Sequence, residues 1–205
     1  NTGIGWRSLS GALAGGDGMN TAVGAAALAA LTTTSSYNTA IGAYAMDGTS
    51  SNVVHYNTAV GYGALGGALT GNSNVAVGYA SLDANTSGAS NVAVGQNALG
   101  ANTTADFNSA VGQNALLLNT TGAGNVALGY NSLLSNTEGA NNVAVGTYAL
   151  DANTTANNNT ALGYGSLGAN TTGTSNVAVG TSALDANSEA DNNVAVGVDA
   201  LTDST

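Results

Sequence analysis

Two glycine-rich segments match the pattern of a nucleotide-binding loop. Gly61–Gly66 and Gly163–Gly168 both read GxGxxG. A dinucleotide-binding turn must open a helix whose N-terminus meets the pyrophosphate. The residues that follow here, Gly67 in one case and Ala169-Asn170-Thr171-Thr172 in the other, are typical of turns. We therefore expect neither segment to bind a nucleotide, and the sequence predicts no cofactor.

The titratable residues are poorly suited to catalysis or metal binding. His55 is the only histidine and there is no cysteine, so no zinc set or His-dependent triad can be completed. Aspartates recur at one phase of the chain: Asp47, Asp83, Asp151 and Asp185. Stacked carboxylates could hold calcium, but the Gly-Gly-x-Gly-x-Asp repeat of such sites is missing. The sequence thus predicts a loop histidine, surface carboxylates, no metal site and no enzyme.

Large aromatic residues at one phase are the best candidates for ligand contact. They are Trp6, Tyr62, Tyr79, Tyr130 and Tyr164. Amphipathic rings are enriched at interfaces, so an exposed line of them could hold a sugar or a partner surface. Other residues, such as Gln96 and Gln113, interrupt the line. These interruptions favour surface packing without a ligand, and ligand contact is the alternative interpretation.

The charge balance excludes several partners. The 205 residues contain one basic residue, Arg7, and 11 Asp and Glu, which gives a formal net charge of −10. Binding to nucleic acid or to an anionic membrane surface requires clustered cations. The longest apolar run, Ala22 to Leu31, is much shorter than a membrane span. The 43% hydrophobic fraction comes mainly from Ala and Val, which argues against one thick core.

A short repeat organises the whole chain. The motif Asn-x-Ala-aliphatic-Gly starts at residues 1, 20, 38, 57, 74, 91, 108, 125, 142, 159, 176 and 193. With the leading Asn as position 0, position 3 is Val, Ile or Leu, position 7 is Ala or Ser, and position 8 is Leu except at Met46. We expect a single array over residues 1–205, with looser units of 18–19 residues and their junction in 1–73 and regular 17-residue units in 74–205.

The repeat predicts an all-β parallel β-solenoid with one coil per unit. Alternation in Asn-Val-Ala-Val-Gly is typical of a strand, with positions 1 and 3 on one face and Ala on the other. The Gly at position 4 favours a turn, and the pair at positions 7 and 8 indicates a second extended stretch. Twelve coils spaced about 4.8 Å apart would form a rod of roughly 58 Å.

A recurring asparagine at position 11 is expected to form a structural ladder, because identical residues lie above one another in a solenoid. Its members are Asn85, Asn102, Asn119, Asn136, Asn153, Asn170 and Asn187.

The coils offer few large aliphatic residues for a core, chiefly those at positions 3 and 8. Burial of a second face against other copies would add the missing apolar contact, and closed rotational symmetry is the usual form of such assembly. Both ends are in phase with the repeat and no capping unit is evident. We therefore expect a self-associating segment of a longer fibre. On this basis, the substitution Val111→Asp or Val145→Asp should bury an unpaired charge in every chain and disrupt the rod.

The pattern Asn-Val-Ala-Val-Gly-x-x-Ala-Leu resembles the head repeats of trimeric autotransporter adhesins of the YadA type. It is also similar to the Asn-Thr-Ala-Val-Gly-Tyr-x-Ala-Leu arrays of phage tail fibres and bacterial surface proteins. The resemblance covers essentially the whole chain. It implies a trimeric, left-handed parallel β-roll that serves attachment on a cell surface or virion.

Three functions remain open at this stage. The first is a structural shaft or head segment of an extracellular homotrimeric attachment fibre, with other copies of the chain as its partners. The second is a module that binds a sugar or host matrix along the solenoid side. The third is an ice-binding solenoid, suggested by pairs such as Thr103-Thr104 but weakened where Glu138 and Glu189 interrupt the rows.

Overall fold

Twelve three-residue strands follow one another along the chain. The computed structural model describes residues 1–11, 18–30, 34–48 and 53–202, and these contain no helix. The strands are β1 Thr2–Ile4, β2 Thr21–Val23, β3 Thr39–Ile41, β4 Thr58–Val60, β5 Val75–Val77, β6 Val92–Val94, β7 Ser109–Val111, β8 Val126–Leu128, β9 Val143–Val145, β10 Thr160–Leu162, β11 Val177–Val179 and β12 Val194–Val196. Each strand covers positions 1 to 3 of its unit.

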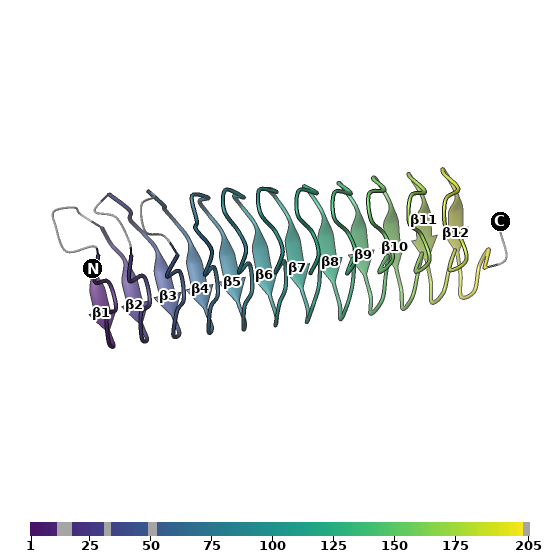
Figure 1. Ribbon diagram of the computed structural model, residues 1–205. Coiled ribbons are helices and arrows are strands. Elements are labelled where there is room, and N and C mark those ends of the chain that lie inside the picture. The colour runs from purple at the N-terminus through teal and green to yellow at the C-terminus, as the bar shows by residue number, and fades with distance from the viewer. Residues whose placement is uncertain (12–17, 31–33, 49–52, 203–205) are drawn as a thin grey trace.

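The strands form one parallel sheet in sequence order, β1 to β12. Equivalent positions pair in every step: Val92 of β6, for example, lies opposite Ser109 of β7. Each unit is therefore one coil, and the coils stack into a rod (Figure 1). The predicted all-β parallel β-solenoid is confirmed. At about 4.8 Å per strand, eleven spacings make a sheet about 53 Å long.

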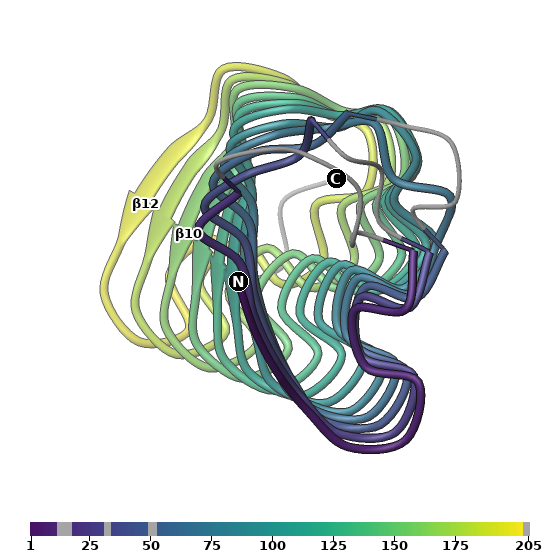
Figure 2. The ribbon, with the colours of Figure 1, turned by 90° about the vertical axis from the view of Figure 1, so that its left-hand side faces the viewer.

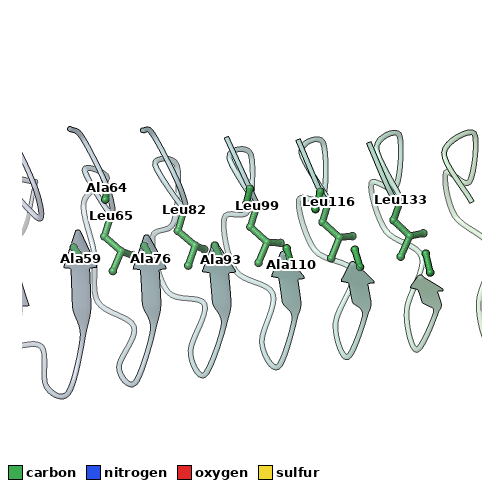
Figure 3. Close-up of a cluster of buried hydrophobic side chains, with 14 of the residues drawn as sticks. Ala59, Ala64, Leu65, Ala76, Leu82, Ala93, Leu99, Ala110, Leu116 and Leu133 are labelled. Carbon is green, nitrogen blue, oxygen red and sulfur yellow. The ribbon is translucent and has the colours of Figure 1, made fainter. Parts of the chain in front are cut away.

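The core of each coil is narrow and consists of small side chains plus one leucine. Ala at position 2, Ala or Ser at position 7 and Leu or Met at position 8 are almost all fully buried. Figure 3 shows this ladder, with leucines such as Leu82 and Leu99 directed toward the strand alanines, Ala76 and Ala93. Each buried leucine contributes about 1.5–3 kcal/mol.

The aliphatic residues at position 3 do not belong to this core. Leu128 is 47% exposed and Val111 is 38% exposed in the single chain. The expectation that position 3 fills the coil interior together with position 8 is therefore wrong. Because side chains alternate along a strand, the inward Ala at position 2 turns positions 1 and 3 outward.

Serine replaces alanine at position 7 without leaving a polar group unpaired. The Oγ atoms of Ser81, Ser132 and Ser166 donate to the carbonyl of the Gly three residues earlier, at 3.0–3.2 Å. The hydroxyl is thereby satisfied inside the coil, which explains why only these two small residues occur there.

A tight turn follows each strand, and its glycine is essential. Gly112 has a φ of 135°, and a Cβ there would lie 2.5 Å from the carbonyl oxygen of Gly129 in the next coil. Residues at positions 6 and 8 also have left-handed φ, 56° for Asn97 and 52° for Leu99. The predicted second extended stretch is therefore wrong. The left-handed conformation directs the two N–H groups toward opposite neighbours. The Asn97 N–H donates to the Tyr79 carbonyl of the preceding coil, and the Leu99 N–H donates to the Ala115 carbonyl of the next coil.

Two asparagines per coil link the turns through the interior. In the eighth coil, Nδ2 of Asn125 and of Asn136 both donate to the Gly139 carbonyl, at 2.8 and 2.9 Å. Asn136 Nδ2 also donates to Asn119 Oδ1 of the preceding coil at 2.8 Å. The same bond joins each successive pair of position-11 asparagines from Asn85 to Asn187. Viewed along the rod, equivalent segments of successive coils follow one another closely (Figure 2).

Candidate binding surface

The aromatic residues singled out in the sequence are all on the surface. Trp6, Tyr62, Tyr79, Tyr130 and Tyr164 are each more than two-fifths exposed. They occupy position 5, directly after the turn glycine, where the chain has left the strand. Tyr62 and Tyr79, in adjacent coils, stack with ring centroids 5.6 Å apart and an interplanar angle of 10°. The structure thus brings these two rings together, as stacked coils require.

Tyrosines at position 6 extend the aromatic row into two separate groups. Tyr44 meets Tyr62 edge to face at 5.6 Å. Tyr148 lies between Tyr130 and Tyr164, at 5.5 and 6.0 Å, nearly perpendicular to both. Sequence reasoning missed Tyr44 and Tyr148, although tyrosine at the adjacent position of an adjacent unit was a readable signal. We call these groups the first triad (Tyr44, Tyr62, Tyr79) and the second triad (Tyr130, Tyr148, Tyr164).

The triads are patches of amphipathic surface and not one continuous stripe. Between them lie coils with Gln96 and Gln113 at position 5. Three adjoining rings provide an apolar face with hydroxyl groups at its edge, which suits a sugar or a protein surface.

A further aromatic pair lies at the other end of the unit. Tyr37 and Tyr56 stack at 5.1 Å with an angle of 7°. His55 precedes Tyr56 and forms a bridge with Ser36, whose Oγ lies 2.9 Å from His55 Nδ1. The described residues contain no group of three or more His, Asp or Glu side chains that could hold a metal ion. The imidazole thus has a structural partner in the neighbouring coil.

The position-9 aspartates lie in two pairs, each across a glycine. A Cβ on Gly66 would meet Oδ1 of Asp83 at 2.8 Å and Oδ1 of Asp47 at 3.6 Å, and Gly168 lies similarly between Asp151 and Asp185. Burial raises the pKa of Asp47, and the charge of Asp83 adds to this effect. Asp47 and Asp151 are half-buried, whereas Asp83 and Asp185 are exposed. The expectation of surface carboxylates therefore holds only for Asp83 and Asp185.

Replacing Asp151 with Asn is expected to raise the melting temperature at neutral pH. Burial, reinforced by the charge of Asp185, raises the pKa of the Asp151 carboxyl above its usual 3.8. Folding therefore favours the protonated form, so this group's stabilising contribution is present below pH 3.8 and is lost as the pH rises through the folded-state pKa. Thermal unfolding followed by circular dichroism should show the gain at neutral pH and its disappearance in acid.

Asp191 is the matched control, because its pKa is lowered by the backbone N–H and hydroxyl of Thr174. Its contribution is present at neutral pH and is lost in acid. Asp191→Asn should therefore lower the melting temperature at neutral pH. Shifts of the same sign for both variants would contradict this assignment.

Rows of threonine use their hydroxyls within the rod. Thr103 Oγ1 donates to the Thr120 carbonyl at 3.1 Å, and Thr120 Oγ1 donates to that of Thr137 at 3.0 Å. The residues at position 13, such as Thr104 and Glu138, are exposed beside this row. The outer surface there is a row of hydroxyl groups that the carboxylates of Glu138 and Glu189 interrupt, whereas a flat ice face would need a uniform row.

The two GxGxxG segments are turns of the solenoid. Their middle glycines, Gly63 and Gly165, have φ of 62° and 59° and occupy the left-handed position 6. No helix begins after either segment, since the described residues hold none. Among the same described residues, no helix has the length and apolar character needed to cross a membrane.

The geometry therefore offers three surfaces: an outward aliphatic strand face, two tyrosine triads and a threonine row. Comparison of the chain with protein-family models, with curated proteins and with solved structures found no match.

Proposed function

We propose that this chain is a structural shaft or head segment of an extracellular homotrimeric attachment fibre. The observation that carries the proposal is the aliphatic stripe, which we define as the outward residues at positions 1 and 3 of all twelve strands. Every one of these residues is Val, Ile, Leu, Thr or Ser, and none is charged, in a chain with 11 acidic residues. An uncharged face along the whole sheet is typical of an interface.

Other copies of the same chain are the occupants that fit this stripe. It runs about 53 Å at a constant register, so a second copy aligned in parallel would present the same spacing of side chains. Residues such as Leu128 and Leu162 each leave 47% of their surface exposed in the single chain. Three copies around one axis would cover these side chains with one stripe per chain and would close the assembly.

The resemblance to adhesin heads and tail-fibre repeats supports the number three, the left-handed course and the location on a cell surface or virion. A rod of similar coils held by ladders of hydrogen bonds suits a spacer that keeps its length under load.

Cross-linking through an introduced cysteine tests the proposal directly, because the chain has no native cysteine. Leu128→Cys places a thiol on the stripe. In a parallel trimer two of the three thiols can pair, so oxidation should convert about two-thirds of the chains to covalent dimers. A trifunctional maleimide should join all three.

Ala169→Cys is the control, since this exposed residue lies outside the stripe. Its chains should stay separate under the same conditions. Equal, slow cross-linking of both variants would show that the stripe is not an interface between copies.

A sugar- or matrix-binding module is the second candidate, and the two tyrosine triads favour it. Their exposed rings stand outside the aliphatic stripe, so binding along the side is compatible with association through the sheet.

A further inference from the structure

A cavity of about 370 Å³ opens beside the first three coils. The first coil contributes Trp6 and Arg7, and the third contributes Tyr44 and Asp47. The second coil contributes only alanines, Ala26, Ala29 and Ala30. The volume is within the range of sites for small ligands.

The cavity results from a local change in the repeat. The second unit has Ala at positions 5, 6, 9 and 10, whereas its neighbours have large or charged residues at several of these positions. The backbones of the three coils stay stacked in register here. The Ala26 N–H donates to the Trp6 carbonyl at 2.8 Å, and the Tyr44 N–H donates to the Ala25 carbonyl at 2.9 Å. The first and third coils are two spacings, about 9.6 Å, apart. The small side chains between them leave a slot wide enough for one ring.

The polar and aromatic groups of the slot are complementary. Arg7 Cζ lies 5.4 Å from the centre of the Trp6 ring. Trp6 is 67% exposed, so its ring is free to contact a ligand. Arg7 carries the only basic side chain of the entire sequence. Asp47 is half-buried, and its raised pKa reflects partial withdrawal from water.

We propose that this cavity, which we call the slot, binds a neutral pyranose sugar. The apolar C–H face of the ring would pack against Trp6 or Tyr44. The Arg7 guanidinium would donate to sugar oxygens and the Asp47 carboxylate would accept from sugar hydroxyls. A few directed polar groups around aromatic walls are the usual composition of such a site.

The charges around the slot select against ionic sugars. An anionic ligand that pairs with Arg7 would face the carboxylate of Asp47 and, one coil beyond Gly66, that of Asp83. A cationic ligand would face Arg7. A neutral polyhydroxylated ring satisfies donors and acceptors without either repulsion.

The slot does not depend on the proposed trimer. Its residues lie at positions 5 to 10, after the turn glycine, and none belongs to the aliphatic stripe. The two proposals can therefore fail separately, and the molar mass measured on the same samples distinguishes them.

Trp6 is the only tryptophan, so its fluorescence reports on the slot alone. The full chain is titrated with the methyl glycosides of glucose, galactose and mannose and with N-acetylglucosamine, and in parallel with glucuronate and glucosamine. We expect a saturable change in emission with at least one neutral sugar, at millimolar concentration or below. Asp47→Asn and Arg7→Gln should each weaken binding about tenfold, the effect of losing one charged hydrogen-bond partner.

Ala29→Leu fills the slot and keeps the reporter, so it should abolish the fluorescence response. Ala84→Leu, at an exposed position of the fifth coil, is the matched control and should bind like the parent. Circular dichroism on each variant establishes that the rod is folded. The proposal is overturned if no neutral sugar changes the emission, if only the charged sugars do, or if Ala29→Leu binds unchanged.

Discussion

Replacing Asn125 with leucine is expected to reduce the free energy of unfolding by roughly 2–4 kcal/mol, since buried groups lose their partners. Asn125 Oδ1 accepts the backbone N–H of Asn142 at 2.9 Å, and its Nδ2 donates to the Gly139 carbonyl at 2.8 Å. Leucine has a similar volume and no polar atom. The Asn142 N–H would be left buried without an acceptor, while Gly139 would keep only the bond from Asn136.

Chemical denaturation followed by circular dichroism measures this loss. Gln113→Leu is the matched control, because it also exchanges an amide for leucine but at an exposed position. The control should change stability by no more than about 0.5 kcal/mol. If both variants unfold at the same denaturant concentration, the buried position-0 asparagines are not the supports that we infer.

The double variant Val111→Asp, Val145→Asp is expected to separate the proposed trimer into folded single chains. Both residues lie on the aliphatic stripe, where the single chain leaves Val111 38% exposed. In the proposed trimer the new carboxylates would be buried without partners, at a cost of several kcal/mol each. This expectation corrects the sequence-based one, in which the same charges entered the core and disrupted the rod itself.

Light scattering with circular dichroism distinguishes the two outcomes. The variant should keep the β signal of the parent with a molar mass of 19.6 kDa. Gln113→Asp adds a charge at an exposed position off the stripe and should leave the association intact. Loss of the β signal in the double variant would mean that these valines support the coil itself.

The sequence was sufficient to predict the strands and their register, but not which face of each strand points into the coil. The constant Ala-aliphatic-Gly spacing allowed only one in-phase stack. Alternation defines two faces, however, and the larger residues at position 3 are the natural choice for a core. The structure places Ala76 inside because the coil is narrow, and Leu82 reaches in from the opposite wall.

The turn conformation could not be predicted for a related reason. Leucine rarely adopts a left-handed φ, since its Cβ then approaches the following carbonyl. Leu99 and its equivalents do so because the stacked coils fix their hydrogen bonds. That constraint comes from neighbouring coils and leaves no local propensity signal.

The candidate site could be predicted only in part. The phase of Tyr62 and Tyr79 showed that they would lie on neighbouring coils, which the ring stacking reflects. The slot beside Trp6 was not recognised, because it depends on the sizes of the side chains at positions 5, 6, 9 and 10 in three successive units. Its signal was the run of alanines in the second unit, which leaves these four positions of that coil without large side chains.

The molar mass of the unmodified chain in solution tests the central claim most directly. Light scattering over a range of concentrations should give about 59 kDa, three times the chain mass of 19.6 kDa. A folded species that stays at 19.6 kDa over that range would contradict the account of the aliphatic stripe as an interface between copies.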